Sequence, residues 1–133
     1  MVEVRALFVG DDYRTEVWIS DSAAKAIKNY AGTKENPRGA LLKKIKRYSL
    51  NGFRAWERRD GPITHEWDGV FRIGHRSSLF RVIGFYGGSK RSEFIIADAY
   101  LKRGQQLSAP DRDRIDAFAR IRKEKLWRKV DDD

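Results

Sequence analysis

The chain has 133 residues, the length of a single domain, and 41% of them are hydrophobic, which is enough material for a core. Lysine and arginine number 28 against 19 aspartates and glutamates, so the net charge of +9 favours an anionic partner: RNA, DNA, an anionic membrane or an acidic protein. The absence of cysteine excludes disulfides and thiolate nucleophiles, and with only two histidines we expect no metal and no cofactor. The charged residues within the first five positions and the lack of a run of about 20 apolar residues predict a cytoplasmic protein without a signal peptide or membrane span.

The hydrophobic pattern predicts two β-rich runs and two helices in the first half of the chain. Residues 2–9 and 15–19 are the β-rich runs, so residues 1–13 form an N-terminal extension or an extra strand. Ser20 and its neighbours offer a helix N-cap. A second helix is expected to begin at Asn36 and Pro37 and to end at Asn51, as one half of an antiparallel pair. The pattern of residues 53–69 is mixed and predicts turns.

The second half of the chain predicts three strands and a helix. Strand-length apolar runs cover residues 70–75, 79–86 and 93–100, with short turns between them, as in an antiparallel meander. A capping pattern at Ser108 opens a last helix, with Ile115, Phe118 and Ala119 on its inner face. Residues 128–133 are expected to be a frayed acidic tail. Residues 1–133 are therefore predicted to form one compact α+β domain with a twisted, antiparallel-rich sheet.

Basic residues within the predicted strands are the most informative charges. Because side chains alternate along a strand, Arg72 and Arg76 project to one side while Phe71 projects to the other. Arg81 stands inside an apolar strand and must reach solvent, a carboxylate or a ligand, because burying it unpaired is costly. One interpretation is an ion pair with Glu66 or Asp98. The other is a phosphate cradle on one face of the sheet, formed by Arg72, Arg76, Arg81, Lys102 and Arg103.

Two further groups complete the set of candidate functional residues. Asp98 and Tyr100 share one side of the last strand and lie next to the Lys102–Arg103 pair, which makes a candidate acid/base group. Lys43, Lys44 and Arg47 lie on the polar face of the second helix. These three are either ordinary solvated charge or an electrostatic contribution to phosphate binding.

From about residue 20 to residue 126, these features in their order resemble the RelE/HigB-like toxins, especially their phage-derived branch. The helix LLKKIKRYSLNG precedes the strand VFRIGHR, whose Arg76 matches the closing arginine of a family strand. The strand FRVIGFY is similar to the family's Tyr-Arg-Val-Leu-Tyr strand, with Arg81 at its arginine. The block IIADAYLKRGQQLSAPDRDRIDAFARIR follows the family's ending, with Tyr100 in place of a phenylalanine and Lys102 and Arg103 in place of a lysine pair.

The resemblance implies a RelE-like fold, with two N-terminal helices and a C-terminal helix packed on the sheet. It also implies the toxin of a type II toxin–antitoxin system: a metal-independent endoribonuclease that cleaves mRNA, commonly on the ribosome, and is silenced by an acidic helix-turn-helix antitoxin. In such an mRNA interferase the substrate's 2′-hydroxyl attacks the adjacent phosphorus, and cations stabilise the phosphorane. Carried onto this chain, the catalytic candidates are Arg72, Arg76, Arg81, Asp98 and Tyr100. The RNA-binding candidates are Lys102, Arg103, Lys43, Lys44 and Arg47.

One strand departs from the family pattern. Gly74 stands where relatives carry a charged residue, and His75 stands at their leucine. Either Asp98 or Tyr100 then replaces the missing base, or the chain is a non-cleaving RelE-fold protein that binds RNA or a partner protein as a phage accessory factor. A DNA-binding accessory role is a third interpretation, which no helix-turn-helix spacing supports.

Overall fold

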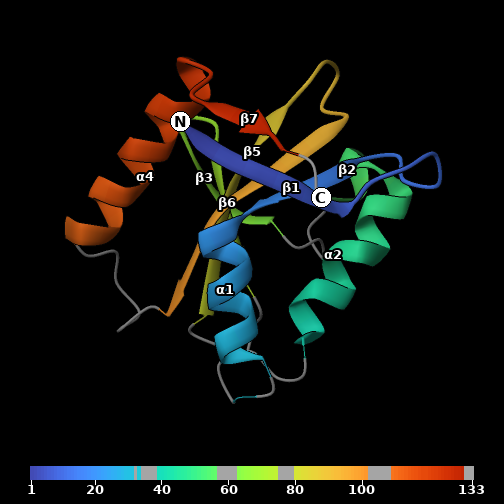
Figure 1. Cartoon of the computed structure of the whole chain (residues 1–133), viewed down its shortest axis with the longest axis horizontal. Helices are drawn as coiled ribbons and strands as arrows, with labels where there is room; N and C mark the ends of the chain where they lie inside the picture. Colours follow the sequence, from blue (N-terminus) through green and yellow to red (C-terminus); the bar gives the residue numbers. More distant parts are fainter. Residues whose placement is uncertain (32, 34–38, 57–62, 75–79, 102–108, 131–133) are drawn as a thin grey trace.

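The computed structural model describes residues 1–31, 33, 39–56, 63–74, 80–101 and 109–130. Within these ranges the chain forms a mixed α+β structure around one sheet with the strand order β3-β4-β5-β6-β2-β1-β7 (Figure 1). The strands are β1 Val2–Phe8, β2 Glu16–Ser20, β3 Ile63–Trp67, β4 Val70–Gly74, β5 Phe80–Gly87, β6 Glu93–Leu101 and β7 Trp127–Lys129. The helices are α1 Asp21–Tyr30, α2 Ala40–Asn51, α3 Phe53–Trp56 and α4 Ala109–Lys123.

The sheet is antiparallel except at two junctions. Strands β3 to β6 form an antiparallel meander, which confirms the predicted run of three strands and adds β3 before it. Strand β2 lies parallel to β6, and β1 pairs antiparallel with β2. The N-terminal segment is therefore a strand of the sheet, in agreement with one of the two alternatives predicted for residues 1–13.

Helices α1, α2 and α3 pack against one face of the sheet. Ile27 of α1, Ile45 of α2 and Trp56 of α3 are buried in a single cluster with Val17 and Phe94 of the strands. Leu41, Ile45 and Tyr48 recur at helical spacing and are buried, so they form the inner face of α2. The predicted start of α2 at Asn36 and Pro37 lies outside the described residues.

Ser20 fixes α1 to the sheet. Its hydroxyl oxygen accepts a hydrogen bond from the Ala23 amide at 3.1 Å, which confirms the predicted N-cap. The same hydroxyl donates to the carbonyl of Ala97 in β6 at 2.7 Å. The cap thus determines where the helix begins and which strand it contacts.

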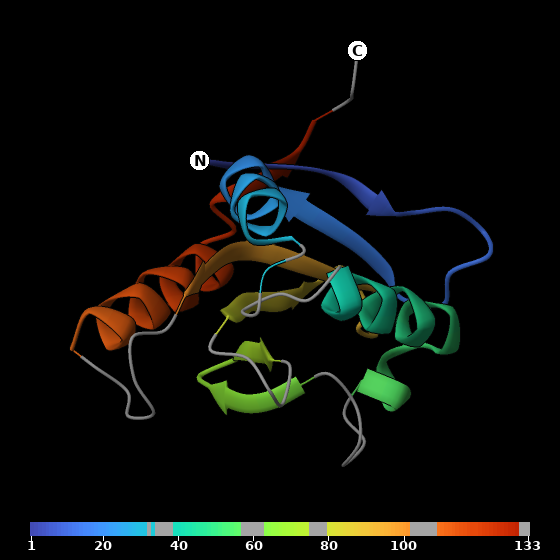
Figure 2. The same cartoon turned by 90° about the horizontal axis from the view of Figure 1, so that it is seen from below.

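Helix α4 covers the opposite face, so that the sheet separates α4 from α2 (Figure 2). Its inner residues are those predicted: Ile115 and Ala119 are buried against Val70 and Ile83, and Phe118 packs at the border of this cluster. The two faces of the sheet therefore carry separate cores.

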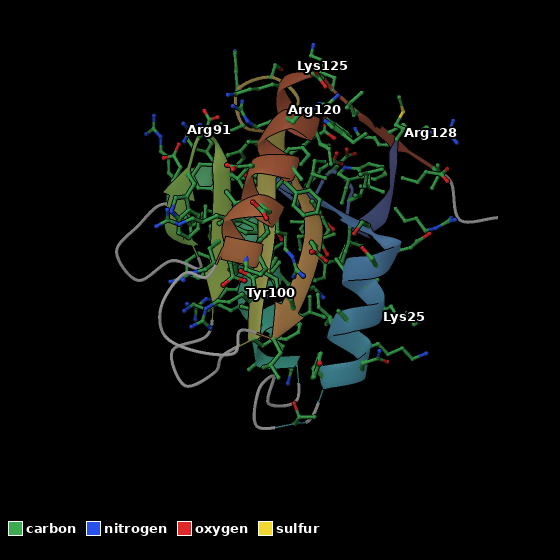
Figure 3. The ribbon with its side chains drawn as sticks, turned by 90° about the vertical axis from the view of Figure 1, so that its left-hand side faces the viewer. Lys25, Arg91, Tyr100, Arg120, Lys125 and Arg128 are labelled. Atoms are coloured by element: carbon green, nitrogen blue, oxygen red, sulfur yellow. The ribbon has the colours of Figure 1, made fainter. Side chains whose placement is uncertain are left out.

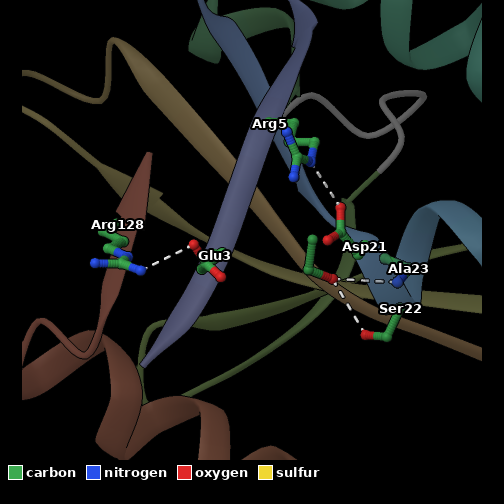
Figure 4. A network of polar contacts seen from close by, with 7 residues as sticks. Glu3, Arg5, Asp21, Ser22, Ala23 and Arg128 are labelled. Carbon is green, nitrogen blue, oxygen red and sulfur yellow. Dashed lines mark hydrogen bonds and ion pairs between the residues drawn. The ribbon is translucent and has the colours of Figure 1, made fainter. Parts of the chain in front are cut away.

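The prediction of a frayed tail is wrong for residues 128–130. After α4 the chain turns at Lys125, whose φ is 54°, and the Leu126 amide donates to the carbonyl of Ile121 at 2.9 Å. This turn returns the chain to β1, where β7 pairs in parallel and the Val130 amide donates to Val4 at 2.9 Å. Two ion pairs connect β1 to its neighbours: Glu3 pairs with Arg128 of β7, and Arg5 pairs with Asp21 of α1 (Figure 4). Residues 131–133 lie outside the described part of the chain.

Candidate nucleic-acid interface

Two arginines lie on the face of the sheet that α4 covers. Arg72 of β4 pairs in register with Ile83 of β5, which pairs with Asp98 of β6; Arg81 of β5 pairs with Tyr100 of β6. Because paired residues in a sheet project to the same side, these side chains share the side of Ile83, which packs against α4. Arg72 and Arg81, the two described members of the predicted cradle, therefore lie on the same face of the sheet as the predicted acid/base pair Asp98 and Tyr100.

Both arginines are partly removed from water and interact with the tyrosine. Burial lowers the pKa of Arg72, and the Tyr100 phenol opposes this by raising it. Burial also lowers the pKa of Arg81, the positive charge of Arg72 lowers it further, and Tyr100 raises it. Arginine nevertheless stays protonated, so two half-buried positive charges lie close together on one surface. Such a pair favours binding of a phosphate group, because an anion relieves both the repulsion and the lost hydration.

The acid/base candidates titrate differently from free side chains. Burial raises the pKa of Asp98, although Arg114 and the Ala99 amide, which donates to its carboxylate at 2.9 Å, lower it. Burial also raises the pKa of Tyr100, Asp111 raises it further, and three arginines oppose the rise. Tyr100 is therefore protonated at neutral pH and suited to donate a proton or hydrogen bond. The raised pKa makes the Asp98 carboxylate a stronger base than that of an exposed aspartate.

Arg114 of α4 completes the cluster and was not among the residues predicted from the sequence. Its guanidinium carbon lies 4.2 Å from the centroid of the Tyr100 ring, and its Nε lies 3.4 Å from Asp98 Oδ2. The ion pair described for Asp98 is thus with Arg114 and not with Arg81. The sequence held one signal for it: Arg114 precedes the inner residue Phe118 by four positions, so it borders the buried stripe of α4. Figure 3 shows Tyr100 at the end of α4 far from Lys125.

The cations of α2 do not belong to this surface. Lys43, Lys44 and Arg47 line a shallow depression on α2, which packs on the other face of the sheet. Arg47 also donates to the hydroxyl of Tyr48 at 3.2 Å. Three of the predicted RNA-binding residues, Lys43, Lys44 and Arg47, therefore lie on the face of the sheet opposite to Arg72 and Arg81. Arg76, Lys102 and Arg103, together with the departure at His75, lie outside the described residues.

Comparison with known protein families finds no family that matches this chain, and comparison with curated proteins finds no significant match. In the part of the chain that the structure describes, no helix is long and apolar enough to cross a membrane. Two arginines, a protonated phenol and a carboxylate can bind a phosphodiester and move protons beside it.

Proposed function

We propose that this protein is an endoribonuclease that cleaves mRNA through attack of the substrate's 2′-hydroxyl, as the toxin of a type II toxin–antitoxin system with a RelE-like fold. The observation that carries the proposal is the placement of Arg72 and Arg81 beside Tyr100 on one face of the sheet. The net charge of +9 supports an anionic substrate and an acidic antitoxin as inhibitor. The order of the elements supports the proposed fold, since an antiparallel meander follows helices α1, α2 and α3 along the chain.

In this mechanism the arginines supply electrostatic stabilisation. Arg72 and Arg81 bind the non-bridging oxygens of the scissile phosphate, where negative charge grows as the phosphorane forms. Their partial burial strengthens each contact, because the dielectric constant near the sheet is lower than in water. The bond that forms joins the 2′-oxygen to phosphorus, and the bond that breaks releases the 5′-oxygen of the next nucleotide, leaving a 2′,3′-cyclic phosphate.

Proton transfer is assigned to Asp98 and Tyr100. Asp98 accepts the proton of the attacking 2′-hydroxyl, because burial raises the pKa of its carboxyl group and makes the carboxylate a stronger base. Tyr100 donates to the departing 5′-oxygen, because its raised pKa keeps it protonated. The departure from the family pattern at Gly74 is compensated in this scheme by groups on β6.

The test is induced expression in a bacterium followed by primer extension on cellular mRNA. We expect cuts phased with codons, growth arrest, and loss of both in Arg81→Ala. Arg120→Ala is the matched control, because Arg120 lies on α4 with a side chain 74% exposed and an ion pair to Glu124. Intact transcripts and normal growth at good expression of the wild type would refute the proposal, as would cleavage that survives loss of Arg81.

A binding protein that does not cleave is the second candidate, and one contact favours it. Arg114 interacts with both proton-transfer candidates, with the Tyr100 ring at 4.2 Å and with Asp98 at 3.4 Å. If this arrangement persists when RNA is bound, Arg114 lowers the basicity of Asp98 and disfavours proton transfer to it. Purified protein that binds single-stranded RNA tightly but leaves it intact, with or without ribosomes, would support this second function.

A further inference from the structure

A depression opens at the border between α4 and the edge strand β3. It lies next to the arginine cluster, the surface formed by Arg72, Arg81 and Arg114 around Asp98 and Tyr100. Its lining includes Trp67 of β3 and Arg112, Ile115 and Asp116 of α4, and its volume is about 340 Å³. This volume lies at the lower end of the range for small-molecule pockets, so it suits one planar ring rather than a large ligand. Ile115 forms its buried apolar side, whereas Arg112 and Asp116 are exposed at its rim.

Trp67 connects this depression to the arginine cluster. It pairs in register with Val70 and packs at the border of the Val70–Ile115 core, which places it on the same face of the sheet as Arg72 and Tyr100. The guanidinium carbon of Arg72 lies 5.8 Å from the centroid of its ring. This separation lies within the limit of about 6 Å for a cation–π contact, so the guanidinium group of Arg72 lies beside the indole ring that lines the depression.

We propose that the Trp67 depression binds an unstacked nucleobase of single-stranded RNA, on which the indole ring of Trp67 stacks, while Arg72 holds the adjoining phosphate. This inference rests on the proposed function for its substrate class and adds a base subsite to it. Aromatic side chains beside a cationic surface are the usual means by which proteins hold single-stranded RNA, because every base has a π-face. An arginine side chain can donate hydrogen bonds and an aspartate side chain can accept them, so Arg112 and Asp116 at the rim suit the mixed edge of a base better than a simple anion.

The test measures binding of two probes by variants of Trp67. One probe is a short, fully 2′-O-methylated single-stranded RNA, which cannot be cleaved by 2′-hydroxyl attack, and the other is its abasic counterpart of the same length. We expect Trp67→Leu to weaken binding of the base-containing probe about tenfold, and to leave the abasic probe within about twofold, because stacking is lost and phosphate contacts remain. Trp67→Phe keeps a ring and should recover most of the affinity.

The matched control is Trp127→Leu. Trp127 is also partly buried and lies on β7, at the opposite edge of the sheet from β3, where its ring packs 6.1 Å from that of Phe85. This variant loses the same ring and should bind both probes as the wild type does. Equal weakening of both probes by Trp67→Leu, or no weakening, would overturn the proposal.

A fluorescence measurement protects the test against loss of folding in Trp67→Leu. RNA should quench the emission of the wild type, and the quenching should disappear in Trp67→Phe, which keeps the packing and leaves Trp18, Trp56 and Trp127 in place. Quenching that persists in Trp67→Phe would also overturn the proposal. The outcomes separate from those of the proposed function: cleavage of unmodified RNA with no base-dependent effect at Trp67 refutes this subsite alone, whereas base-dependent binding without cleavage refutes the nuclease alone.

Discussion

Replacing Arg114 by methionine tests whether α4 controls the acid/base pair of the sheet. The substitution keeps a long apolar stem but removes the guanidinium that contacts Tyr100 at 4.2 Å and Asp98 at 3.4 Å. The Arg114 and Asp98 side chains are 38% and 21% exposed, so their ion pair is screened and contributes about 0.5 kcal/mol to the free energy of unfolding. The cation–π contact contributes a further ~0.5–1 kcal/mol. We therefore expect a loss of about 1 kcal/mol at neutral pH, which lowers Tm by about 4 °C.

The loss of stability in Arg114→Met should depend on pH, because the ion pair exists only when Asp98 is ionised. Burial raises the pKa of folded Asp98 above its unfolded value, so ionising it costs stability as the pH rises through that pKa. Arg114 reduces this cost, and its removal raises the pKa of Asp98 further. The ion-pair part of the loss should reach its full size at pH values well above the pKa that Asp98 has in the variant. It should vanish at pH values below the pKa that Asp98 has in the wild type, where only the loss of the cation–π contact with Tyr100 remains.

The assay is urea unfolding followed by circular dichroism at several pH values between about pH 7 and about pH 4, which brackets the usual range of carboxylates. Arg120→Met is the control, since its ion pair with Glu124 is exposed and should contribute less than about 0.5 kcal/mol. The acid limb of the cleavage profile should also move to higher pH in Arg114→Met, because Asp98 is the proposed base. A loss that is independent of pH, or an acid limb that does not move, would refute the role assigned to Arg114.

Three other predictions follow from the site and the sheet. Tyr100→Phe should lower the rate of cleavage about a hundredfold across about pH 7–9 without weakening RNA binding, because the raised pKa keeps Tyr100 protonated throughout that range. A wild-type rate that decreases between about pH 7 and about pH 9 would contradict the role of Tyr100 as proton donor. Gly84→Ala should destabilise the fold by about 1–3 kcal/mol in urea unfolding, because a Cβ there would lie 2.3 Å from the Phe94 ring and 2.5 Å from a backbone oxygen; a change below about 0.5 kcal/mol would argue against this packing. The double variant Lys43→Gln and Arg47→Gln should reduce the slope of the logarithm of the RNA-binding constant against the logarithm of salt concentration by about 1.4, if α2 contacts two phosphates. Cleavage at saturating RNA should stay unchanged. An unchanged slope would assign these cations to solvated surface.

The sequence alone determined the elements with clear periodicity and the face on which each side chain lies. Alternation placed Arg72 opposite Phe71 and set Asp98 and Tyr100 on one side, because the period of a strand is fixed by its backbone. The Ser20 cap and the inner face of α4 were equally readable, since both depend on residues close together in the chain. The short elements β3, α3 and β7 were missed, because three to five residues give too little periodic signal.

Only the tertiary structure decided which distant groups meet. The pairing of β5 with β6 places Arg81 next to Tyr100. Helix α2 packs on the other face of the sheet, so the sheet lies between these two residues and the α2 cations Lys43 and Arg47. The position of Arg114 over Tyr100, and the depression at Trp67, both result from how α4 lies across β3 to β6. Contacts between α4 and the strands join residues far apart in the sequence, so their geometry is set by the packing of whole elements and no local pattern in the chain encodes it.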